Sequence, residues 1–170
     1  GLQENSKLTL ETLTQFETQY NNTLALIEMN DQKGLYLNRL LTKDEKKFSE
    51  NVSNSINDRL FALKNELALS EAELISLQMQ YGENHSALSS LNQKISLLKA
   101  KLENETRELI SQGVSVADPI HYRQTLMDSV INLQAIRGIL ESKANSYKGL
   151  VDSYDQKLSS LPEKMLEYAR

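Results

Sequence analysis

Residues 60–109 read LFALKNELALSEAELISLQMQYGENHSALSSLNQKISLLKAKLENETREL, and a hydrophobic residue returns in them at every seventh position. A second apolar series, three or four residues further on, keeps one face of an α-helix hydrophobic. Sustained repeats at this spacing make helices wind around one another. The repeat consists of Leu60, Leu67, Leu74, Tyr81, Leu88, Ile95, Leu102 and Leu109.

A second heptad follows the first one, and the first fifty residues carry a looser apolar stripe. No stretch alternates as a strand does, so we predict an all-α chain whose long antiparallel helices form an elongated coiled-coil hairpin or bundle. Leu133, Leu140 and Leu158 should then face the helix that contains Leu60–Leu109. The second heptad runs through Leu126, Leu133, Leu140, Tyr147, Tyr154 and Leu161, and Leu158 joins it.

Few residues in the chain are typical of helix ends. Gly82 favours the end of one helix before Ser86 caps the next, but the heptad phase continues undisturbed, so both a reversal at 82–85 and a continuous helix stay open. Gly113 suits a helix end, and Asp118-Pro119 suits an N-cap followed by a first helical residue. Pro162 suggests another restart.

These boundaries predict helices at about 6–81, 86–112, 119–160 and 162–170, and the first of them is either one helix or two end to end. The stretch from Asp31 to Gly34 is a weaker break within it. Both ends of the chain fall inside helical patterns. We therefore expect residues 1–170 to be a single helical segment of a larger protein.

Composition and motifs argue against several function classes. Lys and Arg number 19 against 23 Asp and Glu, a net charge of −4, which disfavours a nucleic-acid partner. Cysteine is absent, and no phosphate-binding, dinucleotide-binding or zinc-protease motif occurs. His85 and His121 read as turn or capping residues, and the mixed charges of 43–47 read as a solvated helix face. We expect no enzyme activity, no cofactor and no metal ligand.

The tyrosines of the heptads have a structural interpretation. An aromatic ring with a hydroxyl at its edge packs well along a helix seam. We therefore expect Tyr81, Tyr147 and Tyr154 to lie in the core.

Three stretches resemble the bacterial polysaccharide co-polymerases, also called chain-length determinant proteins. The first is Leu74–Leu88 (LISLQMQYGENHSAL), with Tyr81, Gly82 and His85 at positions of the family motif. The second is Ser160–Arg170 (SLPEKMLEYAR), with Leu161 and Pro162. The start Asp118-Pro119-x-x-Tyr122 also fits, so the similarity covers about 58–170. Ser86 departs from the family, which usually has proline there.

The resemblance implies a periplasmic segment of a bacterial inner-membrane protein, anchored by membrane helices outside these residues. Family members form homo-oligomers, and they influence polymer length during synthesis or export of O-antigen, capsule or exopolysaccharide. Their partners include the polysaccharide polymerase and export machinery, and some continue into a cytoplasmic tyrosine kinase. The helical region itself performs no catalysis.

A periplasmic adaptor of an efflux or secretion system is the alternative, because its helical hairpin uses the same apolar seam. Flanking β segments of the lipoyl type would identify the adaptor. A continuation of the motif that begins at Leu161-Pro162 would identify the co-polymerase.

Overall fold

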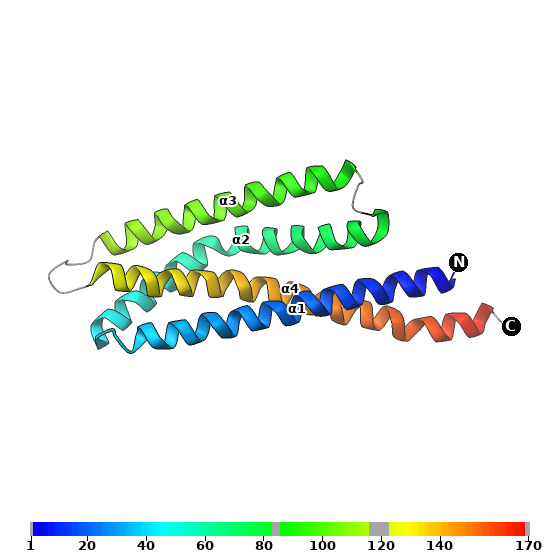
Figure 1. Ribbon diagram of the computed structural model, residues 1–170, viewed down its shortest axis with the longest axis horizontal. Helices are drawn as coiled ribbons and strands as arrows, with labels where there is room; N and C mark the ends of the chain where they lie inside the picture. The colour runs from blue at the N-terminus through cyan, green and yellow to red at the C-terminus, as the bar shows by residue number, and fades with distance from the viewer. Residues whose placement is uncertain (1, 83–85, 116–122, 169–170) are drawn as a thin grey trace.

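A computed structural model of the chain describes residues 2–82, 86–115 and 123–168. Four α-helices account for 96% of these residues, and no strand occurs among them. Figure 1 shows them in chain order as α1 (Leu2–Asn38), α2 (Lys43–Tyr81), α3 (Ser86–Ser115) and α4 (Gln124–Tyr168). The all-α class predicted from the hydrophobic period is confirmed.

The helix expected over about 6–81 is two helices, and the chain reverses between them at residues 39–42 (Figure 1). Thr42 is the N-cap of α2: its hydroxyl accepts a hydrogen bond from the Glu45 amide at 3.2 Å, and Glu45 Oε1 accepts one from the Thr42 amide at 2.9 Å. This reciprocal capping box satisfies two amide donors that a new helix leaves without intrahelical partners. The break is therefore here and not at Asp31–Gly34, which lies inside α1.

The chain also reverses after α2, so the continuous helix through 82–85 is excluded. α2 ends at Tyr81, and Gly82 has φ 79°, a conformation that side chains with a Cβ rarely adopt. The Gly82 amide donates to the Gln78 carbonyl oxygen at 3.0 Å, and α3 starts at Ser86. His85 lies outside the described residues.

The remaining predicted boundaries are corrected. Gly113 does not end a helix, because α3 continues to Ser115 and Gly82 is the one described residue with positive φ. α4 runs through position 162 to Tyr168, so Pro162 starts no new helix; it lacks the N–H of an interior residue, and α4 continues with one backbone hydrogen bond fewer. α4 begins at Gln124, and Asp118, Pro119 and His121 lie outside the described residues.

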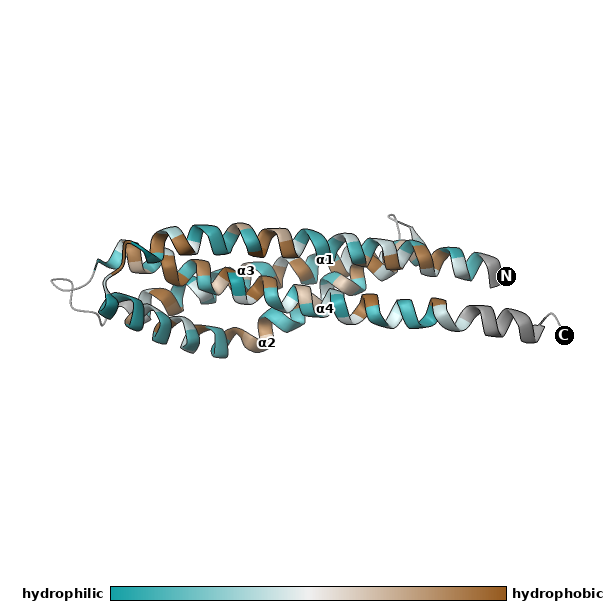
Figure 2. Cartoon of the chain, turned by 90° about the horizontal axis from the view of Figure 1, so that it is seen from below, coloured by the Kyte–Doolittle hydropathy of each residue, from teal (hydrophilic) through white to brown (hydrophobic). Residues whose placement is uncertain are grey.

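The four helices do not pack equally. Successive helices run in opposite directions, and α4 makes its most extensive contacts with α1 and the next most with α2 (Figure 1). α3 packs chiefly on α2 and touches α4 only lightly, while α1 and α3 share no contact in the described parts of the chain. Hydrophobic residues recur between hydrophilic ones along every helix (Figure 2).

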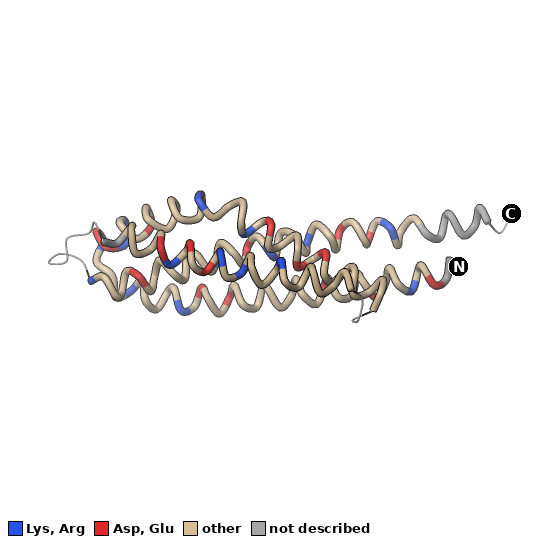
Figure 3. Tube along the Cα trace, turned by 90° about the horizontal axis from the view of Figure 1, so that it is seen from above, with Lys and Arg blue, Asp and Glu red and all other residues tan. Residues whose placement is uncertain are grey.

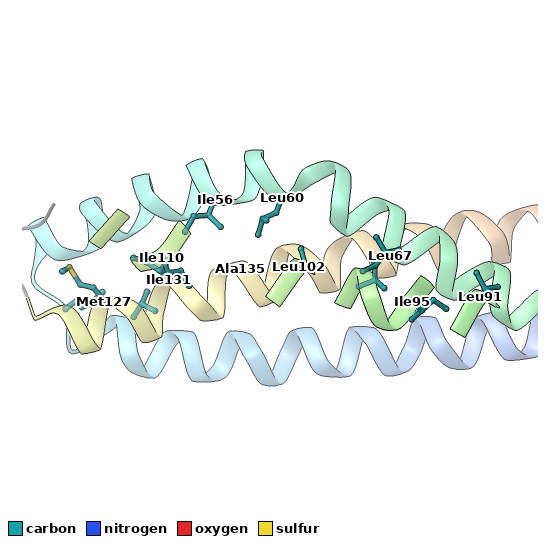
Figure 4. Packing of buried hydrophobic residues seen from close by; sticks show 13 residues of the cluster. Ile56, Leu60, Leu67, Leu91, Ile95, Leu102, Ile110, Met127, Ile131 and Ala135 are labelled. Atoms are coloured by element: carbon teal, nitrogen blue, oxygen red, sulfur yellow. The ribbon is translucent and has the colours of Figure 1, made fainter. Parts of the chain in front are cut away.

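The main core lies where α2, α3 and α4 meet (Figure 4). Five predicted seam residues are fully buried, and Leu74 and Leu126 are half-buried against the same cluster. The five are Leu60, Leu67, Leu88, Ile95 and Leu102.

The buried face of α4 matches the predicted heptad only in part, at Leu126, Tyr147 and Tyr154. Leu133, Leu140 and Leu158 are half-buried and belong to neither core cluster, so they do not form a seam against the helix of Leu60. α4 packs on more than one helix and buries a broader face than a two-helix seam requires. That face is formed by Met127, Val130, Ile131, Ala135, Ala144 and Tyr147.

A smaller aromatic core joins α1 to the second half of α4. Phe16 is fully buried, and its ring centroid lies 6.3 Å from that of Tyr147 and 5.4 Å from that of Tyr154. The core positions predicted for these two tyrosines are confirmed. Tyr81 was predicted in the core as well, but it is 53% exposed, because it stands at the last residue of α2 where the chain turns away.

Candidate functional site

A carboxylate with several hydrogen-bond partners lies where α1 ends and α4 begins. Glu45 is 1% exposed, and its Oε2 accepts hydrogen bonds from the Arg123 amide at 3.1 Å and from Nε at 3.2 Å. Arg123 Nη2 donates to Glu45 Oε1 at 2.7 Å and also to the Leu40 carbonyl oxygen. The Arg123 guanidinium, with the Thr42 cap, lowers the pKa of Glu45 to about 2, although burial opposes this shift.

This arrangement corrects the interpretation of 43–47 as a solvated face. Glu45 points into the molecule, while its charged neighbours from Lys43 to Lys47 are exposed. The carboxylate oxygens of Glu45 already accept hydrogen bonds, and its low pKa makes it a weak base. Glu45 therefore fits a structural role, in which it joins the turn between α1 and α2 to the start of α4.

A second charge cluster lies midway along the helices. Glu71 of α2 contacts Lys99 of α3 at 3.5 Å and Lys143 of α4 at 3.3 Å, so one carboxylate connects three helices. Burial raises the pKa of Tyr147 to about 12, and the negative charge of Glu71 adds to this shift. The Tyr147 hydroxyl is therefore neutral and is no general base at ordinary pH.

A third set of polar contacts joins α1 to α4. Asn30 Nδ2 donates to the Leu133 carbonyl oxygen at 2.9 Å, and Arg137 forms an ion pair with Asp31. Arg137 Nε also lies 3.0 Å from Glu141 Oε1. These contacts fix the relative position of α1 and α4 along their length.

A groove of about 1000 Å³ lies between α3 and α4, which pack against each other only lightly. We call it the α3–α4 groove. Leu102 and Ile110 line it from α3, and Ile136 and Ile139 line it from α4. No aromatic residue is among the described residues that line it.

Charged residues surround the apolar part of the α3–α4 groove. Lys99 and Lys143 are held by Glu71, and Arg107 is held by Glu103 at 3.0 Å. Asp128 differs, since it forms no ion pair with any described residue and its Oδ1 is buried without a hydrogen-bond partner there. Burial raises the pKa of this carboxyl group.

The described residues contain no group of three or more His, Asp or Glu side chains placed to hold a metal ion. Positive and negative residues are interspersed along the described helices (Figure 3). None of the described helices is both long and apolar enough to span a bilayer.

The structure brings some predicted site residues together and leaves others apart. Tyr81 and Gly82 end α2, at the opposite end of the molecule from the Glu45 cluster (Figure 1). The side chains of Leu161 and Pro162 are outside the described part of the chain.

Sequence reasoning missed two features of the site. Glu45 follows Thr42 at the spacing of a capping box, and that pattern could have revealed it. The α3–α4 groove has no local signal, because it depends on which helices pack closely.

No protein-family model matches the chain, and comparisons with curated proteins and with solved structures likewise give no match. The resemblance to the polysaccharide co-polymerases stays a prediction.

Proposed function

We propose that the chain is a non-catalytic periplasmic segment of a polysaccharide co-polymerase, and that it acts through oligomeric assembly in the synthesis or export of surface polysaccharide. The observation that carries the proposal is the reversal at Tyr81-Gly82. Tyr81 and Gly82, two residues of the stretch that resembles the family motif, end α2 just before the chain returns in α3, and this supports the proposal.

The packing of α2 on α3 supports the finer fold in this proposal, an elongated coiled-coil hairpin. Leu60 and Leu67 of α2 and Leu91, Ile95 and Leu102 of α3 bury one continuous apolar cluster. Within each helix these residues lie four or seven positions apart, as in helices that wind around each other.

The charges of the molecule support action by shape. Glu45 is paired with Arg123, just before α4, and Glu71 with Lys99 and Lys143 of two other helices. Carboxylates paired in this way stabilise the packing of helices, and the Tyr147 hydroxyl is held neutral. We propose no cofactor and no enzyme activity for this segment.

The partners in this proposal are further copies of the chain and the polysaccharide polymerase or export machinery. Membrane attachment would come from parts of the protein other than these helices. The net charge of −4 and the intermixed signs make a nucleic-acid partner a poor fit.

The test is removal of the gene in the source bacterium, followed by gel profiles of the surface polysaccharides. We expect a shift to short or absent polymer, restored by the wild-type gene but not by a gene that lacks residues 58–161. Immunoblots control for the amount of protein. An unchanged profile contradicts the proposal, and a defect confined to drug or protein export favours the adaptor.

A further inference from the structure

One side of the C-terminal part of α1, and of the turn that follows it, carries exposed apolar residues. Leu26, Met29, Tyr36 and Leu40 follow one another at three- or four-residue steps, with Lys33 at the centre of the series. Their exposed fractions run from 46% for Leu40 to 65% for Tyr36. We call these five residues the α1 stripe. Such spacing is what a helix presents to a partner helix.

The α1 stripe and the α3–α4 groove lie on the same side of the molecule. Ser129 and Asn132 of α4 line the groove, and they also line a shallow hollow beside Lys33 and Tyr36. The stripe belongs to the second half of α1, and the groove is lined by α3 from Lys99 to Ser111 and by α4 from Gln124 to Lys143. Figure 1 shows that the end of α1, the end of α3 and the start of α4 lie at the same end of the molecule. A single face therefore carries a convex apolar ridge next to a concave apolar groove.

The two features match in length. The stripe extends over 15 residues from Leu26 to Leu40, and the part of it that lies within α1, residues 26–38, is about 18 Å long. The groove follows α3 from Lys99 to Ser111, about 18 Å.

Their charges are also complementary. Lys33 is the only charge of the stripe and takes part in none of the ion pairs found among the described residues. In the groove, Asp128 is the charge without a cation from the described chain. The stripe therefore carries one unpaired positive charge, and the groove carries one carboxyl group without a cation.

We propose that the occupant of the α3–α4 groove is the α1 stripe of a second copy of this chain. Because ridge and groove share one face, a two-fold axis forms the contact twice, and the pair closes on itself. Because the contact forms twice, the surface area that each copy buries is doubled. This brings a narrow stripe closer to the roughly 800 Å² per partner that a stable dimer buries. This proposal rests on the self-association in the proposed function, and it identifies the surface through which two copies associate.

Sedimentation velocity on residues 1–170, from about 10 µM to about 1 mM, covers the range of weak pairs. We expect the wild type to dimerise and Met29→Glu to be monomeric throughout. Leu35→Glu is the matched control, because Leu35 is 62% exposed on the same helix but lies off the stripe. It should dimerise like the wild type.

A second experiment uses the absence of cysteine from the chain. Lys33→Cys protein mixed with Asp128→Cys protein should form a disulfide-linked heterodimer under mild oxidation. Lys33→Cys mixed with Leu97→Cys should not, since Leu97 is exposed outside the groove. Circular dichroism shows whether each variant keeps its fold.

A wild type that is monomeric at every concentration overturns this assignment. So does a dimer that survives Met29→Glu, or one that Leu35→Glu dissociates equally well. These outcomes leave the polysaccharide test untouched, because that test reads the loss of the gene and not the surface that pairs the copies.

Discussion

At the scale of single residues, Glu45 shows what a sequence reveals and what it hides. Its charged neighbours made residues 43–47 resemble a solvated face, and four of the five are indeed exposed. Thr42 at the matching position three residues earlier predicts a capping box. The link to Arg123 joins residues 78 apart in sequence, and no local pattern encodes it.

The Glu45 cluster predicts a specific acid sensitivity. Its pKa is about 2 in the folded chain against an ordinary 4.5, so its stabilisation is complete above pH 4.5 and is lost as the pH falls toward 2. Glu45→Gln should lower the free energy of unfolding by about 1–3 kcal/mol at neutral pH. The difference from wild type should vanish near pH 2.

Urea unfolding followed by circular dichroism across that pH range measures this effect. Asp44→Asn is the matched control, because Asp44 is the exposed neighbour in the same first turn. A wild type and Glu45→Gln variant that differ equally at every pH contradict the role given to Glu45.

Glycine is required at position 113 by the close packing of α3 on α2 and not by a turn. A Cβ there would lie 2.6 Å from Val52 Cγ1 of α2, and the β-branched valine has little freedom to move aside. Gly113→Ala should lower the free energy of unfolding by about 1–3 kcal/mol. Gly149→Ala, where nothing lies within 4 Å, should raise it by up to about 1 kcal/mol. Equal effects in urea unfolding would contradict this difference.

At the scale of helices, the sequence was informative wherever the chemistry is local. The end of α2 at Tyr81-Gly82 and the seam residues Leu60 and Leu67 could be predicted from turn chemistry and from the heptad. The buried face of α4 could not, because a heptad assumes a single partner helix. α4 packs on α1, α2 and, lightly, α3, and its most buried positions follow that wider contact.

The buried face of α4 can be tested with one pair of substitutions. Ile131→Ala should lower the free energy of unfolding by about 2–5 kcal/mol, because Ile131 is fully enclosed by the main core. Leu140→Ala removes a side chain of the same size from the predicted heptad, yet it should cost only about 1 kcal/mol, since Leu140 is half-buried. Denaturant unfolding that gives the larger loss for Leu140→Ala would restore the heptad register.

At the scale of the whole molecule, local sequence patterns predict that the helices are long, but they do not predict which helices pack against each other. The periodicity of α3 shows that one face is apolar, but not that α3 lies on α2 and only touches α4. The α3–α4 groove follows from that unequal packing. It is a property of the assembled helices, and it provides the surface through which we propose that copies associate.

The modal length of the surface polysaccharide is the most direct measure of the central proposal, that this segment acts through assembly. In a strain whose own gene is removed, the complete gene carrying Met29→Glu should give a shifted modal length or less polymer, at unchanged protein level. The gene carrying Leu35→Glu should give the wild-type profile. Wild-type profiles from both genes, or the same profile with the gene absent, would contradict the account.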